Sequence, residues 1–183
     1  MSAPTSDHTI RPALSCDVPT ILRLINELAD YEHALHEVQA TEASLKASLS
    51  FPDTDPTTPP GFGSRVARTL LICPTETPEE VAGMALYFHN YSTWRSTAGI
   101  YLEDLYVNPK YRGRGFGKAL LQALAKLTLE SCGENARLEW SVLKWNRPSI
   151  DFYESRAVGA QMMQEWVGMR VDGEKLKLLA GMS

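Results

Sequence analysis

The sequence of 183 residues is poor in cysteine, has no basic excess and has no long apolar run, and each shortage excludes a class of protein. Its three cysteines, Cys16, Cys73 and Cys132, are far apart and form no CxxC pair. This argues against a disulfide framework or a metal site of the zinc type, and it favours a reducing compartment. The formal net charge of −4 argues against a nucleic-acid partner. With no stretch near the ~20 apolar residues that span a bilayer and no apolar signal core at the start of the chain, we predict a cytoplasmic protein without membrane contact.

What the chain does have is a pattern of apolar residues that predicts one mixed α/β domain over residues 1–183. The expected strands are residues 8–13, 68–73, 81–91, 100–107, 137–143, 160–163 and 165–171. The expected helices lie near residues 17–28, 41–49, 116–131 and 148–155. Residues 51–64 contain four prolines and two glycines, so we expect a surface loop inserted within the domain.

A glycine-rich run, Arg112-Gly113-Arg114-Gly115-Phe116-Gly117-Lys118, joins a predicted strand to a predicted helix. Glycines allow close backbone approach, and the first turn of a helix presents unpaired N–H groups and a positive dipole end. The run therefore predicts a phosphate site rather than only a tight turn. Ala119 stands where a nucleoside-triphosphate loop needs a hydroxyl, and the GxGxG spacing differs from the dinucleotide fingerprint.

This run fits the pattern [QR]-x-x-G-x-[GA], with Arg112, Gly115 and Gly117 in its fixed positions, and so resembles the GNAT family of N-acetyltransferases. Two further segments are similar to the spermidine/spermine N-acetyltransferase group, especially its diamine and thialysine branch. They are Tyr-Leu-Glu-Asp at residues 101–104 and Trp-Asn-Arg-Pro-Ser-Ile-Asp-Phe-Tyr at residues 145–153. The resemblance covers nearly the whole chain.

The resemblance implies an α/β fold with a seven-stranded mixed sheet that splays open after its fourth strand. Acetyl-CoA would lie in the opening as co-substrate, without a metal, and the family commonly forms homodimers. The residues that the resemblance places at acetyl-CoA are Leu105, Tyr106, Val107, Arg112, Gly113, Arg114, Gly115, Phe116, Gly117, Lys118, Asn146, Ser149 and Tyr153.

Transfer to an amine needs a base for the ammonium and an acid for the leaving thiolate. The resemblance makes Glu103 the candidate base, acting directly or through water, and Tyr153 the candidate acid. In a regular strand Glu103 shares a face with Tyr101, Leu105 and Val107, where apolar neighbours raise a carboxyl pKa. Asp104, a candidate for binding the cationic substrate, then faces the other way unless a bulge intervenes.

Tyr31 and Trp94 resemble residues that line the amine pocket, where aromatic faces attract ammonium groups. Relatives that act on polyamines tend to have an acid just before the tryptophan, whereas this chain has Ser92 there. We therefore expect a lysine-like or diamine substrate rather than a long polyamine. A protein or peptide acetyltransferase, an antibiotic-modifying enzyme and a non-catalytic acyl-CoA-binding module remain as alternatives.

Overall fold

The computed structural model describes residues 7–54 and 65–182, so most of the predicted insertion at 51–64 lies outside the described residues. Residues 1–143 and 144–183 form two compact units. Within the described residues, no helix is long and apolar enough to cross a membrane. The elements in chain order are β1 (His8–Pro12), α1 (Val18–Tyr31), α2 (Glu42–Ser48), β2 (Ala67–Pro74), β3 (Gly83–Ser92), β4 (Thr97–Val107), α3 (Phe116–Cys132), β5 (Leu138–Trp140), α4 (Arg147–Glu154) and α5 (Gly173–Leu179), with short 3-10 helices at Ser15–Asp17, Leu35–Glu37 and Pro109–Tyr111.

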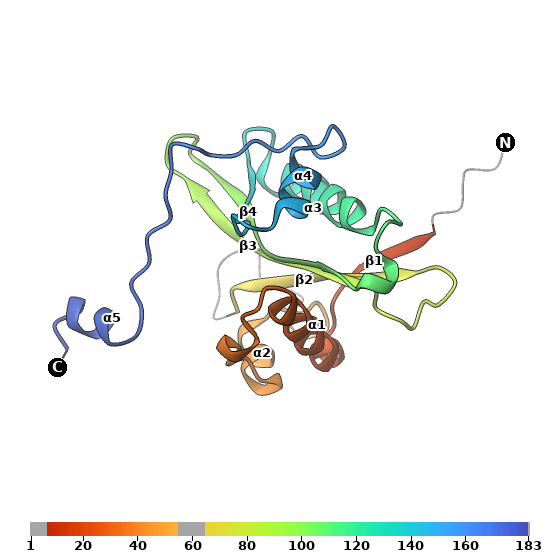
Figure 1. Ribbon diagram of the computed structural model, residues 1–183, viewed down its shortest axis with the longest axis horizontal. Helices are drawn as coiled ribbons and strands as arrows, with labels where there is room; N and C mark the ends of the chain where they lie inside the picture. The colour runs from red at the N-terminus through yellow and green to blue at the C-terminus, as the bar shows by residue number, and fades with distance from the viewer. Residues whose placement is uncertain (1–6, 55–64, 183) are drawn as a thin grey trace. The chain divides into compact units, whose positions relative to one another are not determined.

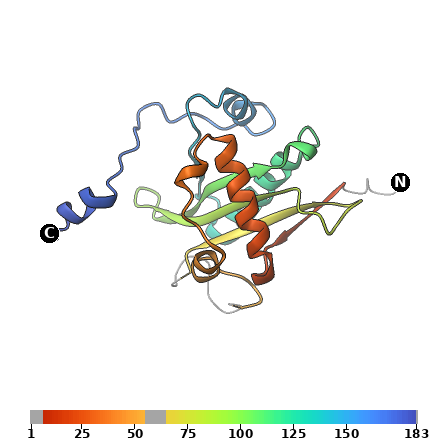
Figure 2. The ribbon, with the colours of Figure 1, turned by 60° about the horizontal axis from the view of Figure 1, so that its bottom comes forward.

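The first unit is built on one mixed sheet with the strand order β1-β2-β3-β4-β5. Neighbouring strands from β1 to β4 run antiparallel, and β4 and β5 run parallel. Helices α1 and α2 cover one face of this sheet and α3 covers the other (Figures 1 and 2). The predicted mixed α/β class and the first nine predicted elements are thus confirmed, with shifts of a few residues at their ends.

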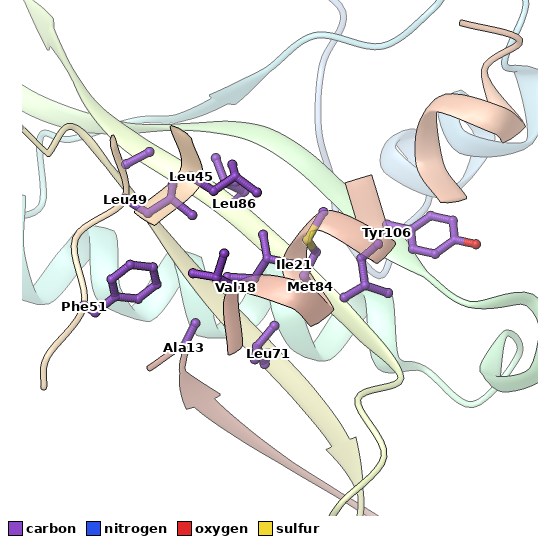
Figure 3. Packing of buried hydrophobic residues seen from close by; sticks show 12 residues of the cluster. Ala13, Val18, Ile21, Leu45, Leu49, Phe51, Leu71, Met84, Leu86 and Tyr106 are labelled. Carbon is purple, nitrogen blue, oxygen red and sulfur yellow. The ribbon is translucent and has the colours of Figure 1, made fainter. Parts of the chain in front are cut away.

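The core between α1 and the sheet follows from the spacing of apolar residues along the helix. Ile21 of α1 is fully buried and packs with Leu71 and Met84 of the sheet (Figure 3). Leu24 of α1 is also fully buried and belongs to the same cluster. Asp17 is the N-cap residue of α1, but its side chain makes no capping hydrogen bond to the helix. Its two oxygens instead accept hydrogen bonds from Arg11 at 2.6 and 2.9 Å, which ties the start of α1 to β1.

A β-bulge interrupts the pairing of β3 with β4. Leu86 lies opposite Asp104, but the next residue, Tyr87, lies opposite Leu102. Glu103 is therefore an extra residue on β4 with no partner on β3. A bulge shifts every later side chain of its strand to the other face relative to simple alternation.

The second unit contains α4 and α5 and corrects one prediction. The strands expected at residues 160–163 and 165–171 are not formed, so the described chain has five strands rather than seven. An extended segment becomes a strand only when its backbone groups pair with a neighbour. In residues 160–171 the large apolar side chains stay exposed, as at Trp166 (64%) and Met169 (91%).

Candidate active site

The glycine loop has the geometry of an anion site. Gly113 and Gly115 adopt left-handed torsions, with φ of 79° and 81°, which glycine accepts without strain. A Cβ added to either would meet nothing within 4 Å, so this side of the loop is open. Gly115 also begins α3 and provides no side-chain cap. The first N–H groups of α3 are therefore left to bind an anion.

The basic side chains of the loop differ in their partners. The guanidinium of Arg114 forms ion pairs with Glu76 and Asp7 and lies 4.7 Å from the centre of the Phe116 ring. These acidic partners offset much of its charge. No hydrogen bond or ion pair is found for Lys118 within the part of the chain that the structure describes. The assignment of Lys118 to the phosphates stays a prediction.

Arg112 joins the loop to α1. Its Nε donates a hydrogen bond of 3.0 Å to the carbonyl oxygen of Val107, at the end of β4. Its guanidinium lies over two aromatic rings, 5.1 Å from the centre of Tyr31 and 5.9 Å from the centre of Tyr106. Cation–π contacts of this kind fix both rings relative to the loop. Tyr31, expected to line the amine pocket, therefore lies close to the loop expected to hold the phosphates.

The second half of β4 has an edge open to a ligand. β5 pairs with β4 only from Ile100 to Leu102. Beyond that point Leu105 and Val107 pair with β3, and no strand in the described residues pairs with them on the β5 side. An unpaired edge offers N–H and C=O groups to an extended ligand with amide groups. The open loop and this edge fit a ligand that combines a pyrophosphate with an amide-bearing arm, as acetyl-CoA does.

The bulge brings two carboxylates to the α1 side of the sheet. Asp104 and Tyr106 lie opposite Leu86 and Met84, which belong to the core beneath α1. Because Glu103 is the bulged residue, its side chain leaves the strand on the same side as Asp104. The prediction that these two carboxylates face opposite ways excepted a strand with a bulge, and the structure has a bulge at this position. Leu105 and Val107 point to the other face and do not surround Glu103.

Burial acts on Asp104 rather than on Glu103, which is exposed. Burial raises the pKa of Asp104 to about 6, with further increases from the charges of Glu103 and Glu32. Glu32 immediately follows α1, and burial raises its pKa as well. Three carboxyl groups thus gather at the bulge, and they favour a bound cation because it relieves their repulsion. The sequence reasoning missed Glu32, although it directly follows the proposed pocket residue Tyr31.

We expect Asp104→Asn to stabilise the protein at neutral and alkaline pH. The carboxyl pKa rises from 3.8 to about 6 on folding, so the folded state holds its proton more tightly. The free energy of unfolding therefore falls as the pH rises from 3.8 to about 6. This loss of stability is complete above that range. At pH 8 the variant should gain about 1–3 kcal/mol and melt roughly 2–10 °C higher.

The measurement is thermal unfolding of both proteins at pH 8 and pH 3.5, where the difference should vanish. Glu130→Gln is the control, because its carboxylate lies on the surface of α3 and pairs with Lys126. This control should change stability by less than about 0.5 kcal/mol. An Asp104→Asn variant less stable than the natural protein at pH 8 would show that the carboxylate is not strained.

Three candidate residues lie in the second unit. The Asn146 side chain caps α4 by accepting a hydrogen bond of 3.3 Å from the Ser149 N–H, and it is buried. The Tyr153 ring is half-buried and lies 5.3 Å from that of Phe152. The assignment of these residues to acetyl-CoA and to catalysis stays a prediction.

The hairpin between β3 and β4 carries Trp94, which is 88% exposed. A large aromatic side chain in water is available to a ligand, although its place in the amine pocket stays a prediction. Ser92 is buried, and its hydroxyl accepts a hydrogen bond of 3.3 Å from the Arg95 N–H. Ser92 thus stabilises the turn and adds no charge to this end of the sheet.

Comparison with known proteins decides the family. The acetyltransferase (GNAT) family profile matches residues 32–159, which include the bulge, the glycine loop and α4. The chain belongs to this family. It is therefore an acyltransferase of the GNAT type, whose members use acetyl-CoA as co-substrate to acetylate an amine.

The curated relatives narrow the comparison. Over 176 residues the chain is 39% identical to thialysine N-epsilon-acetyltransferase of Bos taurus, covering 94% of this chain and 96% of the relative. It is 32% identical to L-ornithine N5-acetyltransferase NATA1 of Arabidopsis thaliana, covering 93% and 86%. An integron cassette protein of V. cholerae has the same fold, with a TM-score of 0.70 at 21% identity over 96% of this chain and 98% of that one.

Proposed function

We propose that this GNAT enzyme acetylates the terminal amine of a small cationic molecule, either a lysine-like amino acid or a short diamine. The observation that carries the proposal is the group of three carboxyl groups at the β4 bulge, because a dense negative site selects an ammonium ion. The names of the thialysine and ornithine relatives support it. So does Ser92, which leaves the hairpin without a negative charge for a distant second amine.

The roles proposed for the carboxylates follow from their positions at the bulge, and the role proposed for Tyr153 follows from the family resemblance. Glu32 and Asp104 attract the ammonium ion, and Glu103, exposed beside them, accepts its proton directly or through water and passes it to solvent. Acetyl-CoA supplies a thioester whose carbonyl carbon is the site of attack. The neutral nitrogen forms a bond to that carbon, the carbon–sulfur bond breaks, and Tyr153 donates its hydroxyl proton to the leaving thiolate. The acylated nitrogen loses its second proton to solvent, and Tyr153 regains a proton from solvent.

Besides burial, the charge of Glu103 acts on its neighbour Asp104 and helps to raise the pKa of Asp104 to about 6. A cation bound at the bulge favours the charged form of Asp104. The site thus has one carboxylate to hold the ammonium ion and another to accept its proton.

The proposal is tested by release of coenzyme A from acetyl-CoA with one amine at a time. The panel holds lysine, thialysine, ornithine, putrescine, spermidine, an aminoglycoside and a lysine-containing peptide. We expect the highest kcat/KM with the lysine-like amino acids or putrescine. A preference for the peptide or the aminoglycoside would overturn the proposal, as would silence across the panel by a protein that binds acetyl-CoA.

A further inference from the structure

A polar network bridges three strands at the hairpin end of the sheet. The Asn90 side-chain nitrogen, on β3, donates a hydrogen bond of 2.8 Å to Glu139 on β5. To do so it crosses β4 at Gly99, which lies opposite Asn90. A Cβ on Gly99 would lie 2.7 Å from the Asn90 side-chain oxygen, so only glycine leaves room for this crossing. Arg137 completes the network, with its Nη2 3.3 Å from a Glu139 oxygen.

This network lies on the same face of the sheet as the carboxylates at the bulge. Glu139 is the neighbour of Tyr101 in the register of β4 and β5, and Tyr101 lies opposite Phe88. The rings of Tyr101 and Phe88 are 5.2 Å apart, and Phe88 packs against the core beneath α1. Asp104 lies on this same side because of the bulge. The aromatic pair therefore forms a floor between the network and the carboxylates.

The spacing along this floor matches a short amino acid. Glu103 follows Tyr101 by two residues along β4, which is about 6.6 Å in a strand, and Glu139 lies one strand away at about 4.8 Å. The backbones of Glu103 and Glu139 are thus roughly 8 Å apart. The side chain of lysine, with five bonds of about 1.5 Å from Cα to its amine, spans roughly 6 Å. A side-chain amine at the bulge therefore leaves the α-carbon near the network.

The Arg137–Glu139 ion pair presents both signs of charge to a ligand. The two side chains are 36% and 33% exposed, so both are accessible to solvent. A guanidinium has five N–H donors and a carboxylate has about four acceptor sites, which leaves groups free on each partner. A zwitterionic head group satisfies both, because its carboxylate accepts from a guanidinium and its ammonium donates to a carboxylate.

We infer that Arg137 and Glu139 form the head-group subsite for an α-amino acid whose terminal amine is acetylated at the bulge. Arg137 binds the α-carboxylate, Glu139 binds the α-ammonium, and Asn90 holds Glu139 in place. The inference rests on the function proposed above and narrows its substrate from small amines in general to amino acids. Lysine and ornithine then bind at both ends, whereas a simple diamine lacks a partner for Arg137.

Three matched substrates separate the parts of this subsite: lysine, cadaverine, which lacks the carboxylate, and 6-aminohexanoate, which lacks the α-amine. We expect Arg137→Met to lower kcat/KM for lysine roughly 10- to 100-fold, the usual value of a charge-assisted hydrogen bond, and to leave cadaverine unaffected. Arg137→Lys should restore part of the loss. Glu139→Gln should lower kcat/KM for lysine and cadaverine but not for 6-aminohexanoate.

The control is Arg95→Met, which removes a neighbouring positive charge whose guanidinium donates to the Asn135 carbonyl oxygen. It should leave the ratio of lysine to cadaverine unchanged. Equal effects of Arg137→Met on lysine and cadaverine, or no effect on either, would overturn the subsite while leaving the proposed function intact. Natural protein that acetylates none of the three substrates would overturn the proposed function together with the subsite.

Discussion

Gly115→Asp should abolish acetyl-CoA binding, with a rise in Kd of at least about 100-fold. Gly115 has a φ of 81°, and a Cβ there meets nothing within 4 Å. The new carboxylate would therefore clash with no protein atom and would project into the open side of the loop. There it would occupy the N–H groups at the start of α3 and repel the pyrophosphate.

Gly133→Asp is a close control for the backbone strain of this change. Gly133 lies just beyond the other end of α3, has a φ of 85°, and is equally open. Both variants place an ordinary residue at a positive φ, and the strain is at least as large at Gly133, where ψ is 176°, as at Gly115, where ψ is 4°. Calorimetric titration with acetyl-CoA should show loss of binding only for Gly115→Asp. Equal affinity in both variants would mean that the loop does not hold the phosphates.

Tyr153→Phe should lower kcat by about 10²- to 10⁴-fold, the range for loss of a general acid, with little change in Kd for acetyl-CoA. The variant removes one hydroxyl and keeps the ring beside Phe152, so α4 should remain folded. Single-turnover rates and titration with acetyl-CoA separate the chemical step from binding.

Tyr91→Phe is the matched control for this prediction. Tyr91 is 63% exposed on β3, with its hydroxyl 3.4 Å from the Ser96 Oγ. By alternation along β3 its side chain points away from the face that carries Asn90. The Tyr91→Phe variant should have the same kcat as the natural protein. A Tyr153→Phe enzyme with unchanged kcat would remove Tyr153 from the acid role and leave protonation of the thiolate to water or to another residue.

The sequence was sufficient for the sheet and its main helices, and it failed at two places for physical reasons. Alternation along residues 100–107 predicts strand β4 correctly but assumes that each residue has a partner. The extra residue at Glu103 is a property of the pairing with β3, so a count along one strand cannot reveal it. The consequence was large, because the bulge reverses the side to which Asp104 points.

The second failure is the pair of strands expected at residues 160–171. Apolar and β-branched residues favour extended backbone there, yet a strand also needs a neighbour to pair with, and the pattern does not supply one. The sequence motif also could not predict where the Arg112 side chain lies. Its motif indicated a phosphate ligand, but the guanidinium lies against Tyr31 and Tyr106, an arrangement that depends on where α1 ends.

The most direct test of the proposed function is a competition for limiting acetyl-CoA. Lysine, ornithine, putrescine, spermidine and a lysine-containing peptide would be mixed at equal concentration, and the acetylated products measured by mass spectrometry. We expect most of the acetyl group on the terminal amine of lysine or ornithine, with putrescine next. Acetyl transfer mainly to spermidine or to the peptide would contradict the proposal that the bulge and the Arg137–Glu139 pair select a short amino acid.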